Sequence, residues 1–523
     1  MTERSDAATA GRGFLIITAA KLWFMVGGVL INFGLPFIFS SRLYGEHGDG
    51  KALYGQYIDI NNTLSILSMV MITGVMQAVS KFVAERPDAP GGIVRQAFRL
   101  MLGVGALVGG GFVIAAPWIA EARNNAALVN GYRAAGIILM AYGLYTVFIG
   151  ALNGRKLFLH QALFDIAFTT LKATLVLGFA LIGLGVTGAF SGFATAAVLI
   201  MVAAMWKVGR RLPGGETAKG LYLYAAWVML YALVFNVIFK LDVLVLKPLV
   251  VDLYTPVAGW LPEGAPVFAW MRERAVEASS DGLIGLYGLA VNIARVPWQV
   301  TIAVTFVVFP MISEAVFSQD KERTRLYIRQ TLRYTMILVG AAAVVLAALP
   351  QALIGLLPKD YAEAAIALAW LAPAYFIFAL FNIVNTLLMG AGRALEALII
   401  GAITCALAAG VYYGLLSSAE HTNEILARAG QGTLIAFTVG LLLGLAVLAK
   451  RYGSPIPVGT TVRVFAIGGA LVLMGRFLPP TGKVVALGLA VAIGIAFLAG
   501  LILTREFGEE DKARLRRVLR RKG

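Results

Sequence analysis

The amino-acid sequence predicts an all-α polytopic membrane protein with about 14 transmembrane helices. We expect two pseudo-symmetric six-helix lobes, related as a parallel repeat, followed by two C-terminal helices. Three observations lead to this prediction. Apolar residues make up 59% of the chain and charged residues 14%, with a mean hydropathy of +0.81. Apolar runs long enough to cross a bilayer follow one another along the chain, and cations gather in every second connection between them.

Hydropathy places the predicted spans along the whole chain, with ends defined to within several residues. The spans lie at about 14–41, 55–80, 96–118, 131–152, 162–183, 187–206, 220–247, 283–313, 334–357, 363–390, 394–416, 430–449, 459–478 and 484–503. The weakest separation is the short turn at 183–187 between the fifth and sixth spans. Such a number of spans defines a multi-pass membrane protein.

The distribution of Lys and Arg sets the predicted orientation. With the N-terminus in the cytoplasm, every predicted inside segment carries cations, as the positive-inside rule requires of short loops in the inner membrane. Both termini are therefore predicted to be cytoplasmic. The net charge of +16 is then a signal of topology, and no nucleic-acid partner is needed to explain it.

These features divide the chain into five predicted parts. They are a cytoplasmic N-terminal segment at 1–13, an N-lobe at 14–219, a C-lobe at 220–453, two further helices at 454–504 and a basic cytoplasmic tail at 505–523. The C-lobe contains an external insert at 248–282, in which a short interfacial helix is expected. The tail is predicted to lie as an amphipathic helix on the anionic inner leaflet.

Several classes of chemistry have no support in the sequence. The single cysteine, Cys405, excludes an internal disulfide and a cysteine metal cluster. The three histidines, His47, His160 and His421, fall in predicted loops or at helix ends, so we expect no metal site and no cofactor. No ATP-binding phosphate loop is present, and the external insert at 248–282 has no catalytic serine–histidine–acid set. We therefore expect no enzymatic activity and assign no catalytic residue.

A repeated motif supports the two-lobe prediction. Leu53-Tyr54-Gly55 opens the second span, and Leu286-Tyr287-Gly288 opens the eighth. At the same offset, Asn62 corresponds to Arg295. Parallel repeats of this kind commonly enclose a central site and alternate its access between the two sides of the membrane. Chance similarity among Gly- and Leu-rich helices is the alternative.

The apolar stretch Gly282–Phe317 carries the most informative charge. Arg295 lies about thirteen residues inside it, roughly 20 Å from the outer end at ~1.5 Å per residue. An arginine at that depth costs a few kcal/mol unless it faces a bundle interior or a watery cavity. Pro297 and Pro310 predict a bend at similar depth and are candidate hinges. The alternative is a structural arginine paired with a carboxylate or a carbonyl.

Five further residues join Arg295 as candidates for a substrate-binding cavity. They are Lys172, Lys240, Lys21, Asp242 and Asn62. Bases outnumber acids among the deeply placed charges, which suits a phosphate or pyrophosphate head group. The alternative for each lysine is that it extends to an interface or pairs with a neighbour such as Asp242.

Several stretches carry a resemblance to a known family. The run YGLAVNIARVPWQVTIAVTFVVFPMISEA resembles the eighth helix of the polysaccharide and lipid-linked oligosaccharide flippases, within the multidrug/oligosaccharidyl-lipid/polysaccharide (MOP) exporter superfamily. LYGQY at 53–57, FKLDVLVLK at 239–247 and the segment 356–393 are similar to the same family. Two departures stand out: the first span holds only Lys21 where lipid II flippases are richer in arginine, and the long insert is not expected.

The resemblance implies a flippase for a lipid-linked glycan, and two other functions compete with it. A multidrug cation exporter of the same superfamily would favour acidic cavity residues and about twelve spans. A membrane glycosyltransferase or ligase would need a large catalytic outer loop, and none is visible. The implied partners are the lipid-linked glycan, membrane lipids and a glycan polymerase or other envelope-assembly proteins.

Overall fold

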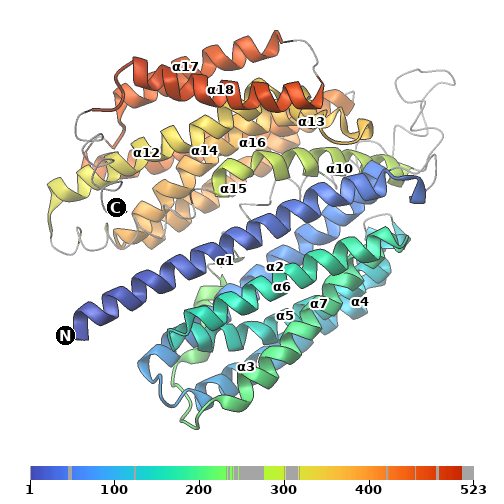
Figure 1. Ribbon diagram of the computed structural model, residues 1–523, viewed down its shortest axis with the longest axis vertical. Coiled ribbons are helices and arrows are strands. Elements are labelled where there is room, and N and C mark those ends of the chain that lie inside the picture. The colour runs from blue at the N-terminus through green and yellow to red at the C-terminus, as the bar shows by residue number, and fades with distance from the viewer. Residues whose placement is uncertain are drawn as a thin grey trace. The chain divides into compact units, whose positions relative to one another are not determined.

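The computed structural model describes most of the chain as helices (Figure 1). The described residues are 2–44, 50–122, 125–230, 232–233, 236–237, 240, 246, 276–299, 301, 312, 316, 319–417, 419, 422–453, 455–478 and 482–508. Within these ranges the chain contains no strand. It forms two compact units, Met1–Gly288 and Leu289–Gly523. The lobe boundary at 219/220 stays a prediction.

The first unit contains the helices from the N-terminus to the start of α10. They are α1 (Thr2–Phe39), η1 (Arg42–Tyr44), α2 (Gly50–Glu85), α3 (Gly91–Gly105), a π-helical turn η2 (Ala106–Gly110), α4 (Gly111–Ala122), η3 (Ala126–Leu128), α5 (Val129–Gly154), α6 (Phe158–Leu181), α7 (Gly185–Lys207) and η4 (Gly209–Arg211). Helix α10 (Val276–Ala294) begins in this unit.

The second unit continues from the end of α10. It contains α12 (Lys321–Ala348), α13 (Pro350–Ile354), η6 (Lys359–Tyr361), α14 (Ala364–Gly390), α15 (Ala394–Leu416), α16 (Thr422–Tyr452), α17 (Val458–Arg476) and α18 (Lys483–Leu503). Helix α14 packs against α12, α15 and α16, while α17 and α18 pack against α12.

Twelve helical stretches in the described part are long and apolar enough to cross a membrane. They correspond to the first six and the last six predicted spans. The other two predicted spans, 220–247 and 283–313, lie partly outside the described residues. Within them the structure gives a short apolar helix, Leu221–Leu230, and the C-terminal part of α10. The all-α polytopic class is confirmed.

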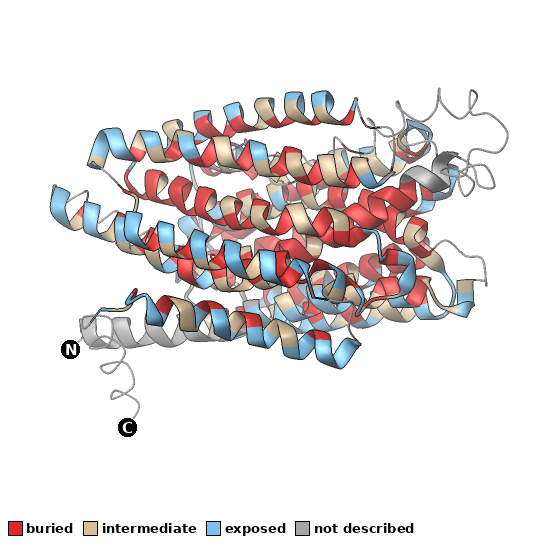
Figure 2. Ribbon diagram, turned by 90° about the horizontal axis from the view of Figure 1, so that it is seen from above, coloured by how far each residue is buried: buried red, intermediate tan, exposed pale blue. Residues whose placement is uncertain are grey.

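Burial differs strongly between helices, as the colouring of Figure 2 shows. The apolar window of the α5 span is 83% buried, and that of α14 is 72% buried. The windows of the α3–α4, α17 and α18 spans are only 22% buried. In water such exposed apolar faces would be costly, whereas in a bilayer they contact lipid tails. The pattern therefore fits one central helix in each unit, surrounded by helices that face lipid.

Small residues allow α2 to approach the N-terminal part of α10. A Cβ added at Gly55 would lie 1.7 Å from the backbone oxygen of Asp281, and one at Gly285 would lie 2.0 Å from the backbone oxygen of Lys51. The aromatic residues of the two repeated motifs, Tyr54 and Tyr287, are fully buried. The glycine-and-tyrosine motif thus belongs to helices in direct backbone contact, as small residues permit within membranes.

Candidate functional site

Lys172 lies on α6, in the first unit, with its ammonium group held by an aromatic ring. Its Nζ is 3.9 Å from the ring centroid of Phe193 on α7. Phe193 belongs to an aromatic cluster with Phe168 and Tyr145. Among the described residues Lys172 has no ion pair and no hydrogen bond, so no carboxylate there neutralises it. An aromatic ring attracts an ammonium group through its quadrupole but carries no negative charge, so the charge of the lysine remains available to an anion.

Lys240 and Asn62 are brought into contact, also within the first unit. The Nζ of Lys240 donates to the Oδ1 of Asn62 at 2.9 Å. Asn62 is 5% exposed, and its Nδ2 is buried without a hydrogen-bond acceptor in the described part of the chain. Nearby on α2, Asp59 accepts a hydrogen bond from Tyr132 at 3.0 Å. The pair therefore combines a cation with an unused amide donor.

Arg295 is buried in the second unit, at an interruption of the helix. It follows the last residue of α10 as a turn, and helical structure resumes at Val296. Pro297 lies two residues on and cannot donate to the carbonyl one turn earlier, which accounts for the break. The Nε of Arg295 donates to the Tyr375 hydroxyl at 2.8 Å, and the guanidinium carbon is 5.3 Å from that ring centroid.

The predicted site residues fall into three groups in the structure. Lys240 and Asn62 are in contact, and Lys172 and Arg295 have aromatic partners on neighbouring helices. Lys21 lies in α1, and its side chain is outside the described set. Asp242 and the candidate hinge Pro310 are outside the described residues. The hinge role of Pro297 stays a prediction.

Sequence reasoning missed the partners of these cations. Phe193 and Tyr375 lie in the sixth and tenth predicted spans, where aromatic residues are common. Nothing in their spacing identifies them as neighbours of Lys172 and Arg295. Only the tertiary packing of the helices brings these residues together, since each aromatic residue and its cation lie on different helices.

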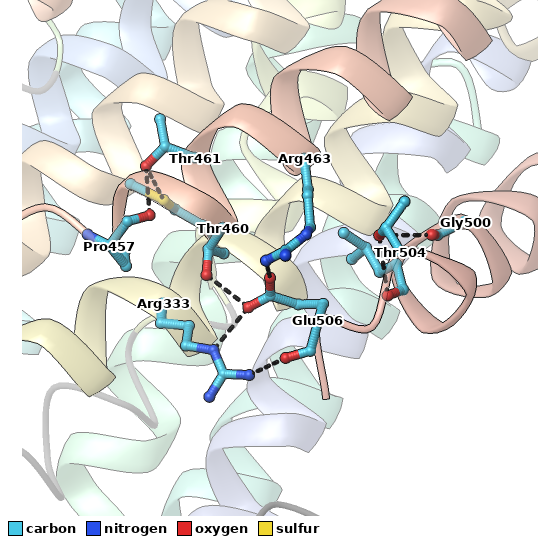
Figure 3. Close-up of polar contacts among 10 residues, drawn as sticks. Arg333, Pro457, Thr460, Thr461, Arg463, Gly500, Thr504 and Glu506 are labelled. Atoms are coloured by element: carbon cyan, nitrogen blue, oxygen red, sulfur yellow. Dashed lines mark hydrogen bonds and ion pairs between the residues drawn. The ribbon is translucent and has the colours of Figure 1, made fainter. Parts of the chain in front are cut away.

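A second feature missed at the sequence level is a buried carboxylate just beyond α18 (Figure 3). The side chain of Glu506 is 2% exposed and accepts from Arg333 Nε and Arg463 Nη1, both at 2.7 Å. Thr460 donates to the same carboxylate at 2.5 Å, and Arg333 also donates to the Glu506 backbone oxygen. We call these four residues the Glu506 cluster. It ties α12 and α17 to the chain after α18.

Charge compensation changes the acidity of Glu506. Burial alone would raise its pKa, but hydrogen bonds from Thr460, Arg333 and Arg463 and the charge of Arg333 outweigh burial and hold the pKa below its ordinary value. The carboxylate is therefore ionised at neutral pH. Because Glu506 bridges Arg333 and Arg463, the cluster is an internal tie in which both guanidinium groups already have a carboxylate partner.

The cations described so far suit binding rather than covalent chemistry. Aromatic faces, a phenol and a side-chain amide orient positive charge without supplying a nucleophile or a general base. Over the described ranges, no group of three or more His, Cys, Asp or Glu side chains is placed to hold a metal ion.

Comparisons with known proteins place the fold. The chain is similar to a structure described as lipid II flippase MurJ in an inward closed conformation, with a TM-score of 0.68 and 13% identity over 94% of this chain and 99% of that one. It is also similar to an inward-facing multidrug resistance MATE transporter of the MOP superfamily, with a TM-score of 0.63 and 12% identity over 80% and 94% of the two chains. The chain has the MOP-superfamily fold.

A third structure, a family model and a search of curated sequences add to this result. A MOP transporter from Pyrococcus furiosus, whose binding pocket is described as having reverse polarity, matches with a TM-score of 0.56 and 14% identity over 84% of this chain and 95% of that one. A family model described as polysaccharide biosynthesis protein matches residues 51–248. No curated protein sequence matches the chain. The MOP resemblance inferred from the sequence is confirmed, and the family match lies within the first unit.

Proposed function

We propose that this MOP-fold protein is a flippase that moves a lipid-linked, polyprenyl-phosphate-type oligosaccharide or polysaccharide precursor across the cytoplasmic membrane by alternating access. In this proposal the chain is a multi-pass inner-membrane protein with both termini in the cytoplasm. It changes the position of its substrate and makes no covalent bond. A glycan polymerase or another envelope-assembly protein would receive the product.

The family match over residues 51–248 is the observation that carries this proposal. It favours the polysaccharide branch of the superfamily over the multidrug branch, which the fold alone does not separate. The matched segment includes Asn62, Lys172 and Lys240, three of the candidate cavity residues. Family and site chemistry therefore support the same kind of substrate.

The electrostatics of the interior supports an anionic head group. Lys172 has an aromatic partner and, within the described chain, no carboxylate to neutralise it. Phosphate oxygens would form charge-assisted hydrogen bonds with such a lysine in a medium of low dielectric constant. With the cell interior negative, outward movement of two negative charges gains about 4–5 kcal/mol at 100 mV.

A multidrug cation exporter is the second candidate, because a MATE transporter shares the fold. A cationic drug would have to approach Lys172, which no described carboxylate neutralises, and like charges repel strongly where water is excluded. This electrostatic cost makes a cationic drug the less favourable substrate.

Reconstitution tests the proposal directly. The purified full chain is placed in vesicles that contain a polyprenyl-diphosphate saccharide with a fluorophore on the sugar. A membrane-impermeant reductant then destroys the fluorophores that face outward. Protein-free vesicles should keep their inner pool, whereas vesicles with the protein should lose it as the substrate crosses. Ethidium uptake is measured in the same preparation.

Mass spectrometry of the recovered lipid completes the experiment. An unchanged mass together with loss of the inner pool supports a flippase. Ethidium transport without movement of the saccharide lipid would instead identify a cation exporter. A change in the saccharide or its linkage would identify an enzyme, and either result would overturn the proposal.

A further inference from the structure

A cavity of about 740 Å³ lies in the first unit, lined by residues from the start of α3 and the end of α7. Its volume is in the range of small-ligand sites, roughly 300–1,000 Å³. Three arginines line it, Arg95 and Arg99 from α3 and Arg210 from η4. Aromatic rings of Phe98, Phe148 and Trp206 complete much of the wall. We call this space the arginine cavity.

The segment after η4 is fixed against α3, so the cavity has a defined wall. The amide of Gly91 donates to the Pro213 carbonyl at 2.9 Å. Gln96 accepts from the Ala218 amide at 2.9 Å and donates to the Ala218 carbonyl at 3.3 Å. A Cβ at Gly92 would lie 2.2 Å from the Gly215 carbonyl oxygen, so the two backbones are in direct contact. The cavity is therefore preformed.

The positive charge of the cavity is uncompensated over the described chain. Arg95, Arg99 and Arg210 have no ion pair and no hydrogen bond to any described residue, and the cavity lining contains no Asp or Glu. Arg95 and Arg99 are four residues apart, so they lie on the same face of α3. All three arginines are exposed, so water and salt screen their mutual repulsion, and a bound phosphate would reduce it further.

Topology alone would also place cations at this end of the unit, because the loops here are predicted to be cytoplasmic. Two cations nearby have partners, whereas Arg155, Lys207 and Lys219 have no ion pair or hydrogen bond among the described residues. Arg86 pairs with Glu216 at 3.5 Å, and the Nζ of Lys81 lies 4.3 Å from the ring centroid of Tyr224. The cavity arginines differ from these cations because all three line one cavity. The positive-inside rule places cations in a loop, but it does not require three of them to line the same cavity.

The cavity is continuous with an apolar face of α7. Val202, Met205 and Trp206 line it, and they are 46%, 44% and 57% exposed. Their spacing puts them on one side of α7, within a stretch apolar enough to span the membrane. Tryptophan is typical of the membrane interface. A ligand here would have an anionic head and an adjoining apolar part, as a lipid has.

We propose that the arginine cavity binds the phosphate group of an anionic membrane phospholipid. Arg95, Arg99 and Arg210 hold the phosphate by charge-assisted hydrogen bonds. Trp206 and its apolar neighbours on α7 contact the glycerol and the first part of the acyl chains. The inference does not rest on the proposed function.

Quenching of Trp206 by brominated lipids tests the site. The full chain is reconstituted in phosphatidylcholine vesicles that contain increasing fractions of phosphatidylglycerol with brominated acyl chains. The signal of Trp206 is obtained as the difference between the wild type and Trp206→Phe. We expect brominated phosphatidylglycerol to quench this signal at lower mole fraction than brominated phosphatidylcholine. Each arginine changed to Gln should weaken that preference roughly fivefold.

A matched triple variant separates a site from general electrostatics. Arg155→Gln/Lys207→Gln/Lys219→Gln removes the same charge from residues outside the cavity lining and should keep the preference. Arg95→Gln/Arg99→Gln/Arg210→Gln should lose it. An equal loss of the lipid preference in both triple variants, or no loss in the triple variant of the cavity arginines, would overturn the proposal. If the second triple is thermally unstable, the single variants replace it under the same criteria.

Two competitors distinguish the source of the phosphate. Millimolar inorganic phosphate should not relieve the quenching, because it lacks the apolar part that contacts α7. Full relief by inorganic phosphate would show a site for a soluble anion. Relief by a small fraction of the polyprenyl-diphosphate saccharide would show a substrate site. Either result would contradict the assignment to a phospholipid.

Discussion

The Glu506 cluster and the arginine cavity use the same residue type in opposite ways. In the second unit, Arg333 and Arg463 converge on one buried carboxylate at 2.7 Å each. In the first unit, three arginines converge on a cavity whose lining has no acidic residue. From sequence, both sets are simply cations near predicted inside ends of spans. The comparison indicates that a carboxylate partner separates arginines that form an internal tie from arginines that remain available to an anion.

The same distinction applies to Lys172 within the first unit. Lys172 resembles the cavity arginines, because its contact is an aromatic ring and no described carboxylate neutralises it. A cation of this kind is costly in a low-dielectric interior unless it is used. We therefore expect the loss of a carboxylate that neutralises arginines to lower stability, and the loss of a cation without such a partner to lower transport.

The largest effect is expected at Glu506. Glu506→Gln removes the negative charge and leaves Arg333 and Arg463 facing each other. We expect a loss of about 2–4 kcal/mol of stability, less than for a fully buried pair because the Arg463 side chain is 37% exposed. Thermal unfolding in detergent measures the loss. Glu216→Gln, at an exposed ion pair with Arg86, is the control and should change nothing measurable.

Acid should reproduce this effect in the wild type. The folded-state pKa of Glu506 is lowered, so its contribution to stability is complete above the unfolded-state pKa of about 4.3 and is lost as pH falls through the folded-state value. The contribution of Glu506 to the free energy of unfolding should therefore not change with pH near neutrality. Below about pH 4 the wild type should lose stability toward the level of Glu506→Gln. Parallel acid curves for the two proteins would exclude the cluster as the cause.

Much of the fold could be predicted because membrane helices are encoded locally. Apolar length and the distribution of cations define spans without knowledge of tertiary contacts, and twelve of the predicted spans correspond to described helices. The π-helical turn at Ala106–Gly110 was not predicted, since the run through it is uniformly apolar and rich in glycine. Hydropathy contains no signal for such a local change in helical register.

The site was only partly predictable. Burial cost identifies Arg295 and Lys172 from sequence, because charges within long apolar runs are few. Their partners Tyr375 and Phe193 could not be found, since helix pairing in a membrane depends on packing of many similar faces. Glu506 was missed for a related reason. It follows the last span, where an acidic residue is expected to be solvated, yet α12 and α17 bury it.

The third prediction concerns Lys172 and separates function from stability. Lys172→Met keeps the length of the side chain and removes the charge. If the lysine binds a phosphate, transport of the saccharide lipid should fall about 10–100-fold, as expected for loss of one charge-assisted hydrogen bond. Thermal stability should be unchanged or higher, because a half-buried cation is no longer present. The measurement pairs vesicle transport with unfolding in detergent.

Lys207→Met is the matched control for this variant. It removes the same charge from the exposed C-terminal end of α7 and should leave transport at the wild-type level. A Lys172→Met protein that transports normally would show that this cation is dispensable. A protein that unfolds at markedly lower temperature would show that Lys172 behaves like the arginines of the Glu506 cluster, contrary to the comparison.

The smallest effect is expected for the hydroxyl that contacts Arg295. Tyr375→Phe removes the acceptor of the 2.8 Å hydrogen bond from Arg295 Nε but retains the ring beside the guanidinium. The net loss of one such bond is about 1 kcal/mol, which is roughly fivefold in a rate or an equilibrium. If Tyr375 positions Arg295 for a phosphate, the rate of saccharide-lipid transport should fall by that factor while thermal stability changes little. Tyr412→Phe, whose hydroxyl contacts Thr433 in the same unit, removes a different buried hydroxyl and should leave transport unchanged. A fall in stability with normal transport for Tyr375→Phe would place Arg295 among the structural arginines, beside Arg333 and Arg463.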